Sequence, residues 1–185
     1  MKRLLILMSA ALLVLSTACA KKKTDTAATQ QKVLVAYFSA TGTTENVAKM
    51  IASATGGELM KIQPKEEYSD EDLDWTEPTS RCCRENDNPQ SRPEFVKSKA
   101  SLDGYDVVYL GFPNWWNMAP RIINTFIEAY DLKGKKVIPF STSGGSGIEN
   151  SVKQLRAAYP DLSISDGKML NFVKEKDIEK FVEQQ

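Results

Sequence analysis

The sequence predicts an α/β fold, with a parallel β-sheet and helices on both of its faces. Short continuous apolar runs, as in strands buried on both faces, alternate along the chain with segments whose apolar residues recur at helical spacing. Strands that alternate with helices form parallel sheets with right-handed crossovers. A chain of 185 residues is the size of one domain with a short leader, and this one contains no internal repeat.

The chain begins with the three zones of a secretory signal. Lys2 and Arg3 precede an apolar run at residues 4–15, and small residues follow that run. The run is too short to span a bilayer well. We therefore expect residues 1–19 to be a signal that exports the protein.

Cys19 is the expected membrane anchor. The signal resembles that of a bacterial lipoprotein, in which the cysteine after the small residues is lipidated and becomes the mature N-terminus. That pattern usually has leucine three places before the cysteine, where this chain has Ser16. Plain cleavage near Ala20 is the alternative, and it would also export the protein. Residues 20–31 lack periodicity and are expected to be a flexible tether to a domain at residues 32–185.

The elements of this domain follow from its apolar pattern. The first strand is expected at residues 33–38, and Val47, Ile51 and Ala54 mark the helix after it. Further strands are expected at residues 59–62, 107–112 and 137–140, and further helices around residues 122–127, 148–159 and 178–182.

The polar segment at residues 64–92 interrupts this alternation. A loop of such length is usually functional or disordered. It contains adjacent cysteines, Cys82 and Cys83, and because a vicinal disulfide is strained we expect free thiols or a structural role. Pro93 is expected to open a short helix through Val96.

Composition excludes several classes of function. Lys and Arg together number 24, as do Asp and Glu, so no net charge would attract nucleic acid. The chain has no histidine, which excludes serine–histidine triads and histidine-bound zinc. The cysteine spacing matches no zinc site. We therefore expect no metal site and no nucleic-acid partner.

The loop after the first strand is expected to bind a phosphate. In a doubly wound sheet, ligands lie beyond the carboxyl ends of the strands. Hydroxyl groups, a glycine and the N-terminus of the next helix together suit an anion. The loop lacks the lysine of a nucleoside-triphosphate site, so a phosphomonoester fits it better; the alternative is that the same residues only cap the helix. The candidate phosphate ligands are Ser39, Thr41, Gly42, Thr43 and Thr44.

Two further candidate loops follow the third and fourth strands. Successive side chains of extended chain point to opposite sides, so Trp115 and Trp116 cannot both be buried against one core. At least one is expected to face a cleft and stack on a flat ligand, with plain packing as the alternative. Glycines in the later loop let the backbone approach a ligand, and Ser146 with Glu149 is expected to form a capping box. The candidate ligand residues here are Pro113, Asn114, Trp115, Trp116, Asn117, Ser141, Thr142, Ser143, Gly144 and Gly145.

Together these loops resemble those of the flavodoxin family, in its lipoprotein type. The resemblance runs from residue 33 to the C-terminus and rests on Val-Leu-Val-Ala-Tyr-Phe-Ser-Ala-Thr-Gly-Thr-Thr, Gly-Phe-Pro-Asn-Trp-Trp-Asn-Met-Ala-Pro and Ser-Thr-Ser-Gly-Gly-Ser-Gly. It implies a five-stranded parallel sheet of order 2-1-3-4-5 that holds one flavin mononucleotide (FMN) non-covalently. The first loop would hold the phosphate, residues 113–117 would flank the isoalloxazine ring, and residues 141–145 would contact its pyrimidine edge. Asn117 departs from the family, which commonly has a small residue there, at a turn that needs positive φ.

The resemblance implies electron transfer through FMN in the bacterial cell envelope, with no catalytic side chain, because the flavin does the chemistry. The expected partner is a redox protein or a small electron acceptor, such as a quinone, and the expected membrane contact is the N-terminal lipid alone. One alternative is an FMN-dependent NAD(P)H:quinone or nitro-compound reductase, in which residues 64–92 could wall the space beside the flavin. A further alternative is a flavin-free binding module, because an exported chain would have to find FMN outside the cytoplasm.

Overall fold

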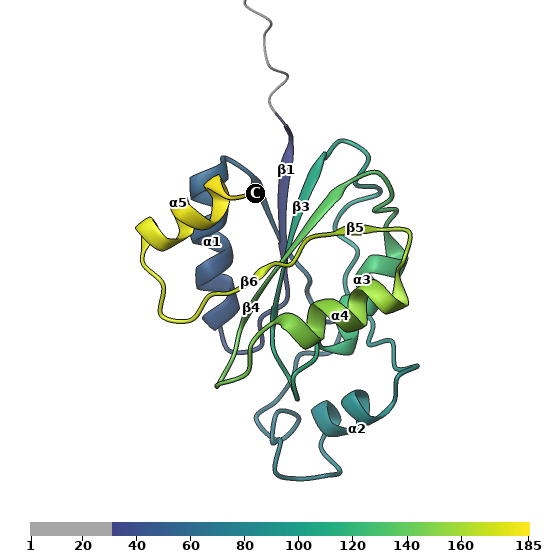
Figure 1. The fold of residues 1–185 in the computed structure, drawn as a ribbon. Coiled ribbons are helices and arrows are strands. Elements are labelled where there is room, and N and C mark those ends of the chain that lie inside the picture. Colours follow the sequence, from purple (N-terminus) through teal and green to yellow (C-terminus); the bar gives the residue numbers. More distant parts are fainter. Residues whose placement is uncertain (1–30) are drawn as a thin grey trace, which may run out of the picture.

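A parallel sheet with helices on both faces forms the centre of the computed structural model, which describes residues 31–185 (Figure 1). Its strands are ordered β2-β1-β3-β4-β5, so the predicted fold class and the strand order 2-1-3-4-5 are confirmed. The predicted signal at residues 1–19, its lipidated Cys19 and residues 20–30 of the predicted tether lie outside the described residues.

Apart from α2, β5 and β6, the helices and strands lie close to the positions that the apolar pattern predicts. The strands are β1 (Val33–Tyr37), β2 (Glu58–Lys61), β3 (Val107–Pro113), β4 (Lys136–Thr142), β5 (Ser163–Ile164) and β6 (Lys168–Met169). The helices are α1 (Thr43–Thr55), α2 (Arg81–Asp87), α3 (Arg121–Ala129), α4 (Glu149–Ala158) and α5 (Glu175–Glu183). Within the described part of the chain, none of these helices is long and apolar enough to cross a membrane.

The fifth position in the sheet is divided between two short strands. β5 pairs with the first two residues of β4, and β6 pairs with Phe140 and Ser141. Between them, Gly167 has a φ of +66°, and a Cβ at this position would collide with the carbonyl oxygen of Pro139. Only glycine lets the chain pass this close to β4 in that conformation.

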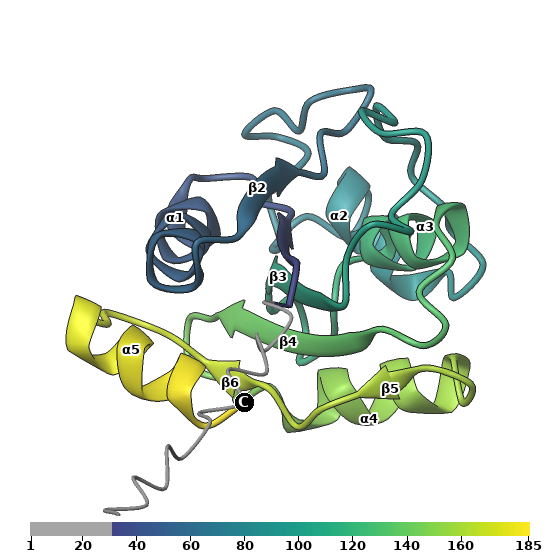
Figure 2. The ribbon, with the colours of Figure 1, turned by 90° about the horizontal axis from the view of Figure 1, so that it is seen from above.

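The two faces of the sheet bury separate apolar layers (Figure 2). α1 and α5 cover one face, whose core includes Val35, Tyr37 and Phe140. α3 and α4 cover the other face, against alternate strand residues such as Leu34 and Ala36. Because side chains alternate between the faces and both faces are covered, each strand appears in the sequence as a continuous apolar run.

Residues 65–94 form a closed loop, called here the insert, whose ends are joined by an antiparallel bridge between Pro64 and Phe95. The prediction of a helix at residues 93–96 is wrong. Phe95 is buried in the core against Phe126, and its backbone stays extended to pair with the other end of the insert. The short helix α2 lies within the insert and was not predicted.

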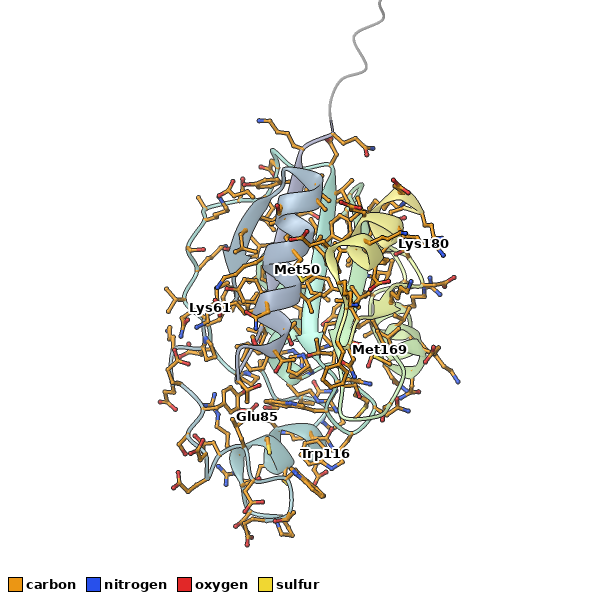
Figure 3. All side chains as sticks on the ribbon, turned by 90° about the vertical axis from the view of Figure 1, so that its left-hand side faces the viewer. Met50, Lys61, Glu85, Trp116, Met169 and Lys180 are labelled. Carbon is orange, nitrogen blue, oxygen red and sulfur yellow. The ribbon has the colours of Figure 1, made fainter. Side chains whose placement is uncertain are left out.

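The insert lies beyond the carboxyl ends of the strands, at the end of the molecule opposite to the point where residue 31 enters (Figure 1). Figure 3 shows Glu85 of α2 and Trp116 of the loop after β3 at this same end. Arg121, the first residue of α3, donates from Nη2 to the carbonyl oxygen of Asn86 at 2.9 Å. This bond fixes the end of α2 to the body of the domain.

Candidate functional site

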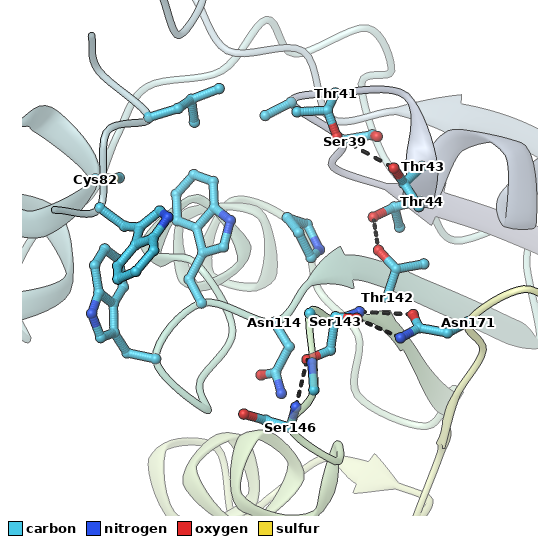
Figure 4. A pocket seen from close by; sticks show the side chains of 18 of the residues that line it. Ser39, Thr41, Thr43, Thr44, Cys82, Asn114, Thr142, Ser143, Ser146 and Asn171 are labelled. Atoms are coloured by element: carbon cyan, nitrogen blue, oxygen red, sulfur yellow. Dashed lines mark hydrogen bonds between the residues drawn. The ribbon is translucent and has the colours of Figure 1, made fainter. Parts of the chain in front are cut away.

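A pocket of about 790 Å³ lies at the carboxyl edge of the sheet, between the loops and the insert (Figure 4). Labelled hydroxyl side chains gather on one side of it, and Cys82 of the insert lies on the opposite side. Most of the predicted ligand residues line the pocket, whereas Gly42, Asn117 and Ser141 do not. The predicted residues that line it are Ser39, Thr41, Thr43, Thr44, Pro113, Asn114, Trp115, Trp116, Thr142, Ser143, Gly144 and Gly145.

The N-terminus of α1 has no side-chain cap. Its N-cap residue is Gly42, at a φ of 87°, and the first backbone bond of the helix joins the amide of Asn46 to the carbonyl oxygen of Gly42 at 3.0 Å. The alternative in which the loop hydroxyls only cap this helix is therefore wrong. The amides of the first turn and the exposed hydroxyls of Thr41 and Thr43 are left for a ligand, and a helix N-terminus favours an anion.

The first loop is also tied to the end of β4. The hydroxyl of Thr44 is 2.8 Å from the hydroxyl of Thr142, and only 1% of Thr44 is exposed. Ser39 is also buried, and its Oγ accepts a hydrogen bond from the amide of Gly42 at 3.1 Å. These two hydroxyls shape the loop, while those of Thr41 and Thr43 are the exposed ones.

Trp116 and Asn117 form a two-residue hairpin turn after β3. The amide of Trp115 donates to the carbonyl oxygen of Met118 at 2.9 Å, and the reverse bond is also 2.9 Å. Trp116 has a φ of 45° and Asn117 a φ of 62°, as in a type I′ turn. Asn117 thus holds the positive φ that the turn needs, and its carbonyl oxygen accepts from Asn150 Nδ2 at 2.9 Å.

The insert holds Trp115 in place. The Trp115 ring meets Phe38 edge-on at 5.7 Å between centroids and Tyr68 of the insert at 5.6 Å. Arg81 lies 4.0 Å over the Tyr68 ring, and the Tyr68 hydroxyl donates to Glu85 at 2.5 Å. Burial, followed by this bond to the carboxylate, raises the pKa of Tyr68 well above its ordinary value. Tyr68 is therefore a neutral hydrogen-bond donor that is fixed beside the Trp115 ring.

The two tryptophans lie in different environments, as predicted. Trp115 is half-buried in the aromatic cluster, whereas 41% of Trp116 is exposed at the pocket. Trp116 therefore presents ring surface to a ligand.

The loop after β4 presents backbone amides and small side chains. Ser143 Oγ accepts hydrogen bonds from the amides of Gly145 at 3.1 Å and Ser146 at 2.9 Å. The predicted capping box of Ser146 with Glu149 is wrong, because α4 begins at Glu149 itself and has no side-chain cap. A Cβ built on Gly144 or Gly145 would meet nothing within 4 Å, so this stretch of backbone faces open space.

Two predicted ligand residues differ from the prediction: the side chain of Asn114 lines the pocket but is bonded within the protein, and Ser141 does not line the pocket. Asn114 joins the loops, since its Nδ2 donates to the carbonyl oxygen of Gly147 at 2.7 Å and its Oδ1 accepts from Ser151 at 2.7 Å. Ser141 is fully buried, and its hydroxyl has no hydrogen-bond partner within the described part of the chain. Strand alternation turns Ser141 away from the side on which Thr142 meets Thr44, so Ser141 does not reach the pocket.

Sequence reasoning missed several lining residues. The insert contributes Leu73, Trp75 and Cys82, and the segment after β6 contributes Asn171 and Phe172. The length of the insert indicated a functional loop, but not which of its side chains face the pocket. The segment after β6 was not considered, because strands of two residues leave no periodic pattern.

Within residues 31–185, no charged side chain lines the pocket. A phosphate would therefore be held by hydroxyls, amides and the helix dipole. Burial raises the pKa of the Cys82 thiol above its ordinary value, which lowers its thiolate fraction. With donors on one side and aromatic rings on the other, the pocket suits a flat ring system that carries one phosphate.

Comparison with known proteins found a matching family model and similar solved structures. The sequence model of the flavodoxin family matches residues 32–185. The structure of a provisionally assigned flavoprotein from Bacteroides uniformis is 47% identical, with a TM-score of 0.81 over 83% of this chain and 98% of that one. A similar one from Bacteroides eggerthii is 49% identical, with a TM-score of 0.81 over 83% and 97%. No curated protein matches the chain.

A more distant structure shares the fold. It is a flavoprotein from Lactobacillus acidophilus in complex with FMN, 21% identical, with a TM-score of 0.66 over 82% of this chain and 99% of that one.

The buried contact between Thr44 and Thr142 makes a prediction about stability. Thr142→Val keeps the shape of the side chain but leaves the Thr44 hydroxyl buried without its partner, so unfolding free energy should fall by about 1–3 kcal/mol. The double variant Thr44→Val with Thr142→Val removes both hydroxyls and should lose less than the sum of the single variants. Urea denaturation measures all three, with exposed Thr76→Val as the control. Additive losses would show that the two hydroxyls do not interact.

Proposed function

Because this chain belongs to the flavodoxin family, we propose that it binds one FMN in the pocket and transfers electrons in the bacterial cell envelope. FMN, the cofactor expected from the sequence, is supported by membership of the family and by the FMN complex of the Lactobacillus acidophilus flavoprotein. The observation that carries the proposal is the uncapped N-terminus of α1, which faces the same pocket as the aromatic loop after β3. The flavin-free alternative is disfavoured because the exposed hydroxyls and amides suit the phosphate.

The residues of the pocket divide into two groups by their chemistry. Thr41 and Thr43, with the amides at the start of α1, would hold the phosphate. The exposed ring of Trp116 would pack against the isoalloxazine, and the amides near Gly144 and Gly145 would donate to its polar edge. When bound, FMN supplies the one- and two-electron chemistry, and the protein orients it and tunes its potential.

The carrier function is favoured over catalysis by a side chain. Among residues 31–185, the side chains that line the pocket are of uncharged types, and burial raises the pKa of the Cys82 thiol. An electron carrier needs no ionised acid or base beside the flavin. Its partner would be a redox protein or a small electron acceptor that reaches the flavin at the open edge of the pocket.

One observation favours a second candidate, a reductase of quinones or nitro compounds. Leu73 and Trp75 of the insert line the pocket, and 72% of Trp75 is exposed. The volume of about 790 Å³ is toward the upper end of the roughly 300–1,000 Å³ typical of ligand sites. An apolar wall beside the flavin could hold a flat acceptor.

The location in the cell envelope rests on residues 1–19. Their basic, apolar and small zones, followed by Cys19, support export and a lipid anchor. The membrane contact in this proposal is the lipid alone, and nucleic acid is not a partner.

The phosphate site predicts a preference for FMN over riboflavin. Thr43→Ala should weaken FMN binding about fivefold or more, the equivalent of about 1 kcal/mol for one hydrogen bond to a charged group, and leave riboflavin binding unchanged. Titration of the domain from residue 31 onward by flavin fluorescence quenching measures both. Thr55→Ala, at the other end of α1, is the control. Equal wild-type affinities for the two flavins would exclude the phosphate site.

Turnover separates the carrier from the reductase. As a carrier, the FMN-loaded protein should oxidise NADH or NADPH with a quinone at a rate close to that of free FMN. A reductase should show a saturable rate of roughly 1 per second or faster. If such a rate is found, a raised KM for the quinone in Trp75→Ala would assign the acceptor site to the insert.

The anchor predicts where the protein is found in cells. Cys19→Ser should move the protein from the membrane fraction to the soluble fraction, with its thermal stability unchanged, because the first strand begins only at Val33. Fractionation of cells that express each form measures this. If the wild-type protein is already in the soluble fraction, the proposed lipid anchor on Cys19 is wrong.

A further inference from the structure

Phe172 is a large apolar side chain at the rim of the pocket, and no contact with the rest of residues 31–185 buries it. Its relative exposure is 102%, the highest among the exposed large hydrophobic side chains of residues 31–185. It also lines the pocket. Exposed aromatic rings forgo the stabilisation that burial gives, so packing within this structure does not explain phenylalanine at this position.

The backbone of Phe172 adds a second cost. Its φ is 51°, in the left-handed region, which is uncommon for bulky residues. Within residues 31–185, the other non-glycine residues with positive φ are Trp116 and Asn117, in the turn after β3. Asparagine tolerates this conformation, whereas tryptophan and phenylalanine do so less readily. Strained residues of this kind cluster at ligand sites, and both aromatic ones here line the pocket.

Neighbouring residues hold Phe172 in this position. The amide of Leu170 donates to the carbonyl oxygen of Ser141 at 2.8 Å, and Leu170 is buried. Asn171 bonds the backbone of Ser143 in both directions: its Oδ1 accepts from the Ser143 amide at 2.9 Å, and its Nδ2 donates to the Ser143 carbonyl oxygen. Phe172 therefore follows directly after two anchored residues.

The position of Phe172 also complements the other aromatic groups. The loop after β4 has only Ser, Thr and Gly at the pocket, and the tryptophans come from the loop after β3 and from the insert. Phe172 is the aromatic side chain that the segment after β6 brings to the pocket. Neither burial nor backbone preference favours phenylalanine here, so the missing contact must come from something that enters the pocket.

We propose that Phe172 is a flavin-contacting residue whose ring packs against the isoalloxazine of bound FMN and is buried by it. This inference rests on the proposed binding of FMN and adds to it a residue that the sequence motifs did not include. It also accounts for Asn171, whose paired bonds to Ser143 position the ring.

Two substitutions separate the ring from the backbone. Phe172→Asn removes the ring and suits the left-handed conformation, whereas Phe172→Tyr keeps the ring. Without flavin, Phe172→Asn should melt about 2–4 °C higher than the wild type, because strain is relieved. Its Kd for FMN should rise about 3- to 10-fold, and its Kd for riboflavin by the same factor, because both flavins share the ring system. Phe172→Tyr should bind both flavins within about twofold of the wild type.

The control is Val96→Asn, which changes another exposed apolar side chain that does not line the pocket and should leave both affinities unchanged. If the wild type binds FMN and Phe172→Asn binds it equally well, the role of Phe172 is disproved while the proposed function stands. If Phe172→Asn loses affinity for FMN but not for riboflavin, Phe172 acts on the phosphate part of FMN, and the proposed contact with the ring is disproved. A lower melting temperature for unliganded Phe172→Asn would contradict the strain argument. If the wild type binds no FMN, both proposals fail.

Discussion

The parallel register of β1, β3 and β4 is the constraint on which the site depends. Pro113 pairs with Thr142, and β1 pairs with β3 up to Gly111, so the three strands end at one edge and their loops meet there. Side-chain bonds then join loops that are distant in sequence, such as the contact of Thr44 with Thr142 and that of Asn114 with Gly147. Because these contacts are internal, the protein sets the width of the pocket before any ligand binds.

The pocket combines this fixed frame with neutral chemistry. Its lining side chains among residues 31–185 carry no charge, so the groups that favour an anion there are the backbone dipoles and hydroxyls at the start of α1. In the proposed function, the reactive chemistry is supplied by the cofactor. The insert completes the opposite wall, and Tyr68, held by Arg81 and Glu85, keeps the Trp115 ring in one place.

Local sequence patterns were informative where they were long. The apolar runs predicted β1, β3 and β4, and the resemblance to flavodoxins supplied the strand order. They failed where tertiary contacts compete with local preference: Phe95 is buried in extended chain where a helix was predicted, and Ser146 does not cap α4. They gave no prediction for β5 and β6, because a strand of two residues shows no periodic pattern. The pocket residues that follow β6, Asn171 and Phe172, were missed for the same reason.

The sequence by itself determined the α/β class, the residue types in the three loops and the absence of lysine from the loop at the first helix start, for which it predicts a phosphate. Only the tertiary structure decided which of those groups face a ligand. Thr44 turned out to be buried against Thr142, Ser141 to point away, and Phe172 to stand exposed at the rim. The reason is physical: periodicity and propensity act over a few neighbouring residues, whereas the direction of a side chain at the pocket depends on the register and packing of strands that lie far apart in the chain.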